Sequence, residues 1–349
     1  RDSRGEEAEE FGDPSRNVAW KERARIVLAW QGVSLLLTGT AVFSQLLADH
    51  GVNLPTTQSF FNYLALGIWF GSSFLRRGES PREKWKYLII AIADVEGNFL
   101  LVMAYQFTTI ISIQLLDCFT IPVVMILSWR LLGAKYRRWH LAGAGISLAG
   151  LGLLVTADAV MSQKNDAEPA RNPILGDVLV MIGSTLYGIS NVGQEYMVKE
   201  RDRVEFLAHL GVFGAIVSGI QMGVTESDGI RQLFLSGNLK IFLYLMGFNG
   251  CLLGMYVLVP LLLEISSATF MNLSLLTADF YSLLFALMLF SAKPTILYFM
   301  AFAVIITGII IFNVAGDASR PRHRHTALKS ESEEEMSQSI VERKEDLRR

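Results

Sequence analysis

Five acidic residues lie inside long apolar stretches of this chain, where a charged side chain needs a specific partner. They are Asp94, Glu96, Asp117, Glu195 and Asp279. An ionisable group in the hydrocarbon core of a membrane costs at least about 2.5 kcal/mol on insertion scales, so it normally faces a partner or a water-filled cavity. Carboxylates in such a place bind a solute or carry a proton, and we expect that chemistry here.

Amide and tyrosine side chains recur at helical spacing beside these acids. The spacing predicts four polar faces, which are Asp94 with Asn98 and Tyr105, Gln114 with Asp117, Asn191 with Glu195 beside Tyr187, and Asn272 with Asp279 beside Tyr281. Glu96 points nearly opposite to the first face. These residues form the predicted set for binding a substrate or a proton. Asp117, Glu195 and Asp279 would hold the charge, the amides would orient the solute, and the tyrosines would stack on a ring.

Interhelical hydrogen bonding is the alternative explanation for each residue taken alone. Such bonds contribute only about 0.6 kcal/mol each on average and hold a bundle together. Four polar faces in corresponding positions of two halves exceed what packing requires, so we favour a shared central cavity. No Lys or Arg occupies the middle of any apolar stretch. An acidic cavity without bases favours a neutral or cationic solute over a phosphorylated one.

Ten apolar stretches must position these residues, and each is long enough to cross a bilayer. A spanning helix needs about 20 mostly apolar residues, because the hydrocarbon core is about 30 Å thick. The stretches cover residues 25–47, 58–76, 85–107, 111–133, 138–157, 174–197, 204–224, 239–263, 266–290 and 295–314. Hydrophobic residues make up 51% of the chain, and the mean hydropathy is +0.37. We therefore predict an all-α integral membrane protein with ten transmembrane helices.

Basic residues are distributed unevenly among the connections between these stretches. Most lie on the side of the N-terminus, where one connection carries Lys199, Arg201 and Arg203, and none lies in the first two connections on the other side. The positive-inside rule then places both termini in the cytosol. The polar tails, 1–24 and 316–349, are expected to be disordered.

The two halves of the chain resemble each other weakly. Residues 114–155 parallel residues 271–312, and each of these segments ends in a Gly-containing span. Five spans in each half make the second half enter the membrane from the opposite side. This predicts two inverted five-helix repeats, 25–157 and 174–315, joined by a loop at 158–173, with the solute bound between them.

Other functional classes find little support in the residues. No metal-ligand set and no nucleophile with a base occurs at helical spacing, so we expect neither an enzyme nor a metal or other cofactor. The net charge of −2 averages basic loops with an acidic tail and indicates no nucleic-acid partner. Gly219-x-x-x-Gly223 and Gly250-x-x-x-Gly254 predict close helix contacts, with a homodimer contact as the alternative.

Four longer motifs occur in order along the chain. They are Ile92–Asn98, Ser112–Pro122, Leu186–Asn191 followed by Glu195 and Tyr196, and Thr277–Ser282. These motifs resemble solute carrier family 35, subfamily F, and within it the branch of members F1 and F2. The resemblance covers residues 25–315. It implies the drug/metabolite transporter fold and kinship with nucleotide-sugar transporters, with modified nucleobases or nucleosides of the queuine type among the proposed cargoes.

Residues and resemblance together predict a multi-pass secondary transporter in the lipid bilayer. We expect it to move a small organic solute by alternating access, with a neutral or cationic heterocycle such as a nucleobase or nucleoside as cargo. A buried carboxylate would allow proton coupling. Two alternatives stay open, a Golgi nucleotide-sugar antiporter and a membrane scaffold or receptor without turnover. No sorting signal separates the plasma membrane from the Golgi and other endomembranes.

Overall fold

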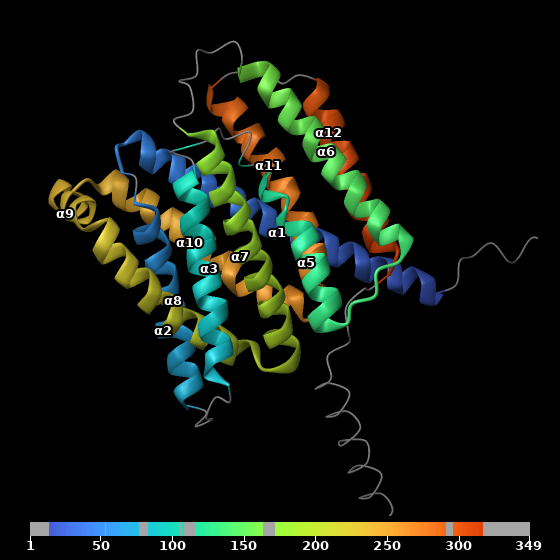
Figure 1. Cartoon of the computed structure of the whole chain (residues 1–349), viewed down its shortest axis with the longest axis horizontal. Helices are drawn as coiled ribbons and strands as arrows, with labels where there is room; N and C mark the ends of the chain where they lie inside the picture. Colours follow the sequence, from blue (N-terminus) through green and yellow to red (C-terminus); the bar gives the residue numbers. More distant parts are fainter. Residues whose placement is uncertain are drawn as a thin grey trace, which may run out of the picture.

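The computed structural model describes residues 14–52, 54–76, 83–104, 107, 113, 116–162, 172–290 and 296–316, and these ranges are helical apart from short connections (Figure 1). The helices are α1 Pro14–Asp49, α2 Pro55–Arg76, α3 Lys84–Ala104, α5 Thr120–Leu127, the π-helix η1 Ser128–Leu132, α6 Arg138–Ser162, α7 Pro173–Glu200, α8 Arg203–Thr225, α9 Ser227–Ser236, α10 Leu239–Leu263, α11 Ala268–Phe290 and α12 Ile296–Val314. The described part of the chain contains no strand. The prediction of an all-α protein is therefore confirmed for these residues.

Helix bounds follow the expected stretches with a few differences. α10 covers 239–263 as expected, whereas α1 begins at Pro14, inside the stretch expected to be a tail. The fourth expected stretch is described only in part, where α5 and η1 cover 120–132. The short helix α9 was not expected, because its ten residues are too few and too polar to have been taken for a span.

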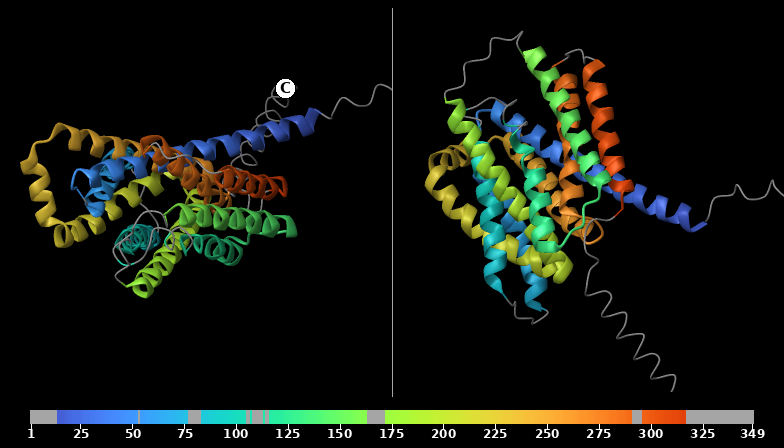
Figure 2. Two further views of the ribbon diagram at one scale, coloured as in Figure 1. Left: turned by 90° about the horizontal axis from the view of Figure 1, so that it is seen from above. Right: turned by 45° about the vertical axis from the view of Figure 1, so that its right-hand side comes forward.

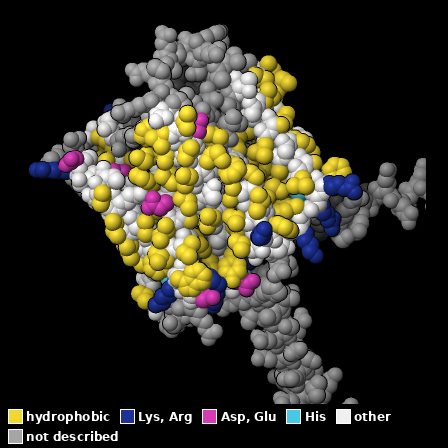
Figure 3. Space-filling view, viewed as in Figure 1, with side chains coloured by type: hydrophobic (Ala, Val, Ile, Leu, Met, Phe, Trp, Pro, Cys, Tyr) yellow, Lys and Arg dark blue, Asp and Glu magenta, His cyan; other side chains and the backbone are white. Residues whose placement is uncertain are grey.

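Five of the described helices are long and apolar enough to cross a membrane. They are Ala24–Leu47 within α1, α3, Ile174–Glu200 within α7, α8 and α10. Large apolar side chains stay exposed along them, among them Ile92, Ile182 and Ile220. The face drawn in Figure 3 is mostly hydrophobic, with most of its Lys and Arg near the edges. Helices that satisfy their own backbone and expose such side chains suit contact with lipid, so this is an integral membrane protein.

Of the three hydrophobic core clusters among the described residues, the two large ones hold most helices together, and α7 contributes to both. The larger cluster includes Trp30 of α1, Phe280 of α11 and Ile305 of α12, with Val192 from α7. The smaller cluster joins α2, α3 and α8 to the last turns of α7, where Met197 is buried. Figures 1 and 2 show α6 beside α12, and α2, α3, α7 and α8 grouped together. Polar residues on α7 therefore lie where the two clusters meet.

Glycines allow the closest helix contacts, at positions other than the expected ones. A Cβ on Gly143 of α6 would lie 2.6 Å from the backbone nitrogen of Phe312 on α12, and a Cβ on Gly211 of α8 would collide with the backbone of Gly67 on α2. In each expected Gly-x-x-x-Gly pattern one glycine lies close to a neighbouring helix: a Cβ on Gly219 would lie 3.1 Å from Phe60 of α2, and one on Gly254 would lie 3.3 Å from Leu36 of α1. A Cβ on Gly223 or Gly250 would meet nothing within 4 Å. The glycine spacing thus found one close contact per pattern but not the closest pairs, because it cannot say which partner helix faces a glycine.

Candidate functional site

One face of α7 carries a row of polar side chains that bond to several neighbouring helices. The helix starts at an Asn172 cap, whose side chain accepts from the Leu175 N–H at 3.3 Å, with Pro173 in the first turn. From there α7 packs against α3, α5, α8, α10 and α11. We use the name α7 seam for the polar contacts made by Ser184, Ser190, Asn191, Glu195 and Lys199.

Asp94 of α3 is the carboxylate at the centre of this seam. Its Oδ2 accepts hydrogen bonds from the hydroxyls of Tyr63 and Tyr256, each at 2.6 Å, and its Oδ1 accepts from the hydroxyl of Ser190 at 2.9 Å. The residue is only 3% exposed. Four helices, α2, α3, α7 and α10, thus converge on one buried carboxylate that is held by hydroxyl groups. Such a group can exchange a proton or meet a cationic solute when the helices move.

Asp117 lies beside the amino-terminal half of the seam. Its Oδ1 accepts from the hydroxyl of Ser184 on α7 at 2.9 Å and sits 3.5 Å from the hydroxyl of Thr120. In the part of the chain that the structure describes, no Lys or Arg pairs with Asp94 or Asp117. Both carboxylates therefore lack a positive partner there, which gives the seam an acidic character.

Asn98 and Glu96 face a different site, between α2, α3 and α8. Asn98 donates to the hydroxyl of Ser59 at 2.7 Å, and the amide of Gln221 reaches Glu96 at 3.5 Å. A small cavity of about 10 Å³ lies beside Asn98 and is lined also by Thr56 and Gln221. This is room for a single water, so the cavity does not hold an organic solute in this conformation.

The predicted residues on α11 also separate. Asn272 accepts from the side chain of Asn191 at 3.1 Å and so joins the α7 seam. Tyr281 instead donates to the Gln31 side-chain oxygen on α1 at 2.9 Å. Tyr187 is half-buried on α7. Tyr105 and Gln114 lie outside the described residues, as does the side chain of Asp279, so the structure does not place these three.

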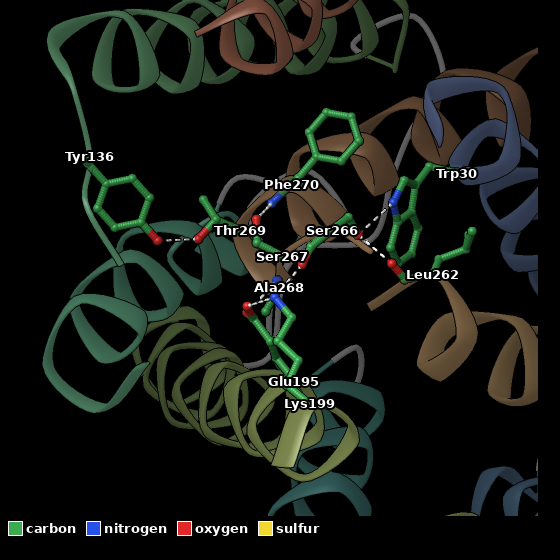
Figure 4. Close-up of polar contacts among 10 residues, drawn as sticks. All are labelled: Trp30, Tyr136, Glu195, Lys199, Leu262, Ser266, Ser267, Ala268, Thr269 and Phe270. Atoms are coloured by element: carbon green, nitrogen blue, oxygen red, sulfur yellow. Dashed lines mark hydrogen bonds and ion pairs between the residues drawn. The ribbon is translucent and has the colours of Figure 1, made fainter. Parts of the chain in front are cut away.

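The carboxyl end of the seam contains a buried ion pair. Lys199 Nζ lies 2.7 Å from Glu195 Oε1 and donates to the Ser266 carbonyl at 2.6 Å, while Glu195 Oε2 accepts from the Ala268 N–H at 2.7 Å (Figure 4). Lys199 was expected in the connection after the sixth stretch, and this was wrong, because it lies in the last turn of α7 with only 5% of its surface exposed. Its positive charge faces the interior, next to Glu195.

Three of these residues were missed by reasoning from the sequence. Lys199 stands four residues after Glu195, and that spacing puts a Lys and a Glu on the same side of a helix, so the signal was present. Tyr63 and Tyr256 carried no such signal, because neither has an acidic residue at helical spacing, and only the packing of α2 and α10 brings both hydroxyls to Asp94.

Comparison with known proteins agrees with these features. The family model described as "SLC35F: Solute carrier family 35" matches residues 20–314. Solute carrier family 35 member F2 of Mus musculus is 41% identical over 81% of this chain and 76% of its own length, and the Xenopus tropicalis protein of that name is 40% identical over 85% and 78%. An uncharacterized family 35 member of Schizosaccharomyces pombe is 35% identical over 83% of this chain and 58% of its own.

One solved crystal structure superposes with a TM-score of 0.64 over 82% of this chain and 96% of that chain. Its sequence is 17% identical, so the likeness concerns the fold alone. The family match covers most of the chain, and the relatives match it over four-fifths of its length. The chain therefore belongs to subfamily F of solute carrier family 35, a family of membrane transporters in the drug/metabolite superfamily.

Proposed function

We propose that this protein is a secondary transporter that moves a small organic solute by alternating access, with the α7 seam as its substrate and coupling site. The observation that carries the proposal is Asp94, a buried carboxylate bonded to hydroxyls from three other helices. Those bonds cross between helices of both halves of the chain. A proton or a cationic group on Asp94 would weaken them and so link binding to helix movement.

The cargo we propose is a neutral or cationic heterocycle such as a nucleobase or nucleoside, including the queuine type. Asp94 and Asp117 supply negative charge, and Tyr63, Tyr187 and Tyr256 supply aromatic surface near it. The positive charge of Lys199 does not cancel the negative charge of these two carboxylates, because Lys199 is paired with Glu195. The binding set we propose keeps Asp94, Asp117, Asn191 and Asn272 from the residues predicted from the sequence and adds Tyr63 and Tyr256.

Helix pairing supports our proposal of two inverted five-helix repeats, and we place both termini of the ten-span protein in the cytosol from the distribution of basic residues. If α1, α2, α3, α5 and α6 correspond to α7, α8, α10, α11 and α12, exchanging the halves turns one contact into another. The contact of α1 with α10 becomes that of α7 with α3, and the contact of α1 with α11 becomes that of α7 with α5. The pairs α2 with α8 and α6 with α12 map onto themselves. This is the pattern expected of a pseudo-two-fold axis.

A nucleotide-sugar antiporter is the second candidate, and the observation in its favour is the buried Lys199. A phosphorylated cargo needs cationic partners in a low-dielectric site. Lys199 would have to leave Glu195 to serve such a cargo, so this candidate requires the larger rearrangement.

Flux into proteoliposomes tests the proposal directly. We expect saturable uptake of a labelled nucleobase or nucleoside by the wild type. Asp94→Asn should lower this uptake rate at least about tenfold, because the free energy of one hydrogen bond to a charged group is enough for a factor of that size. Asp228→Asn, on the exposed surface of α9, is the matched control and should transport normally. Wild-type rates in Asp94→Asn would refute the coupling role. Exchange of a nucleotide sugar for its monophosphate would favour the second candidate.

A further inference from the structure

The ion pair at the end of α7 holds the segment that connects α10 to α11. Lys199 donates to the backbone carbonyl of Ser266, and Glu195 accepts from the backbone N–H of Ala268. Figure 4 shows both side chains pointing from α7 toward this segment. Every polar contact here is made to main-chain atoms of residues 266–268, so the contacts depend on where that segment lies and not on its side chains.

Two further elements close on the same segment. Trp30 of α1, which is fully buried, donates its indole N–H to the hydroxyl of Ser266 at 3.2 Å. Tyr136, in the connection between η1 and α6, lies with its hydroxyl 2.6 Å from that of Thr269. Residues 266–269 are thus bonded to α1, to α7 and to the connection before α6. At this end of the molecule the helices meet around a buried, polar contact.

Glu195 and Lys199 are poorly suited to bind a solute in this conformation. Both Glu195 oxygens already accept from the protein, and only 1% of the residue is exposed. A buried ion pair is also a weak source of stability, because desolvation of the two charges offsets most of their attraction, and a hydrophobic pair of similar volume often does as well. A pair of this kind adds little net stability, which suits a contact that has to break and re-form.

α11 does not need Glu195 in order to begin. The hydroxyl of Ser267 accepts from the Phe270 N–H at 3.2 Å, which is an N-terminal cap within the helix's own sequence. The segment before it follows Pro260, which removes one backbone donor near the end of α10. The start of α11 can therefore move away from α7 and keep its helical structure.

We propose that Glu195 and Lys199 form a latch that closes the transport pathway at the end where α7 terminates. Opening this end separates residues 266–268 from α7, breaks the bonds to Ser266 and Ala268, and exposes both charges to water. The proposal rests on the alternating access proposed above. In the topology we propose, the latch faces the cytosol, so it is the inward gate of the transporter.

A cysteine reporter measures the opening of this gate without any cargo. The reporter is Ala268→Cys, at a fully buried position, in a background with Cys118→Ser and Cys251→Ala. A membrane-impermeant maleimide is applied to purified protein in liposomes from either side. We expect slow labelling with the latch intact. Lys199→Met should raise the labelling rate from one side by at least about tenfold. It removes the charged hydrogen bond to Ser266 that stabilises the closed gate, and the free energy of such a bond is enough for a factor of that size.

Two matched variants separate the latch from general loosening of the fold. Arg203→Gln removes the partly exposed contact with Glu264, 3.8 Å long and at the same end, and should leave the labelling rate unchanged. A second reporter is Leu54→Cys, at a buried position at the start of α2. This end of α2 lies beside the end of α8, away from the end of α7 that carries the latch. Its labelling rate should not change in Lys199→Met. A response of both reporters would mean general destabilisation and would overturn the latch.

A double variant covers the case in which Lys199→Met fails to fold, since it leaves Glu195 charged and unpaired. Glu195→Leu with Lys199→Met removes both charges and keeps the volume, which is the substitution that buried pairs tolerate best. Faster one-sided labelling in this variant supports the latch, and an unchanged rate overturns it. Labelling requires no substrate, so a failure to find flux of any heterocycle would count against the proposed cargo and leave this result standing.

Discussion

Removal of one tyrosine hydroxyl from Asp94 gives the sharpest test of the charge at the centre of the α7 seam. Tyr63→Phe and Tyr256→Phe each delete a 2.6 Å bond to Oδ2 and leave the ring in place. Hydrogen bonds to charged groups contribute about 1.5 to 3 kcal/mol, whereas interhelical bonds between neutral groups in membranes average about 0.6 kcal/mol. If Asp94 is ionised, each variant should lose about 1.5 kcal/mol or more of unfolding free energy.

A double-mutant cycle with Asp94→Asn isolates the contribution of the charge. In the Asp94→Asn background the acceptor is neutral, so each Tyr→Phe change should cost only about 0.6 kcal/mol, and the coupling energy should be about 1 kcal/mol. The assay is reversible unfolding in mixed micelles followed by the loss of helical circular dichroism. Tyr244→Phe is the control, because Tyr244 lies on α10, as Tyr256 does, but packs its ring against His50. Equal costs in both backgrounds would refute an ionised Asp94 bonded to these hydroxyls.

Two further predictions concern the helix contacts that frame the site. Gly143→Ala should lower the melting temperature by several degrees, because a Cβ there would lie 2.6 Å from the Phe312 nitrogen. Gly145→Ala on the same helix is the control: a Cβ there would have no neighbour within 4 Å, so this change should be neutral or stabilising. Glu226→Ala should cost roughly 1 kcal/mol in the same unfolding assay, because its carboxylate accepts from the first backbone N–H groups of α2 at 2.8 Å. Glu226→Gln keeps one acceptor oxygen but not the charge, so it should lose part of this stability, and wild-type stability in Glu226→Gln would contradict a charged cap.

The proposed latch and Asp94 would together give the proposed alternating access a physical basis in α7. Asp94 bonds helices of both halves near the middle of α7, and the latch closes one end of the same helix. Both contacts use α7, so a movement of this helix changes both. In this proposal, protonation or solute binding at Asp94 is linked to the gate because α7 carries contacts to both.

The sequence by itself determined that the chain is helical, apolar and built for a membrane. Length and hydropathy are local properties, so the start and end of α10 could be read directly, and the motifs around Asp94 and Asn191 were sufficient to indicate the family. Spacing along α3 separated Glu96 from Asp94, and the two residues have different partners, but it also put Asn98 on the face of Asp94, whereas Asn98 bonds to Ser59 beside a cavity that Gln221 also lines.

Only the tertiary structure decided which polar groups meet. Tyr63 and Tyr256 are 193 residues apart and reach one carboxylate because α2 and α10 pack beside α3, a relation that no local pattern encodes. Lys199 looked like a loop cation because the residues after it are charged, yet α7 continues through it and turns it inward. The charges and the helical period of the polar residues could be read from the sequence. The partner of each charge depended on how separate helices pack. For that reason Glu195, predicted to bind the solute, became one half of a proposed latch.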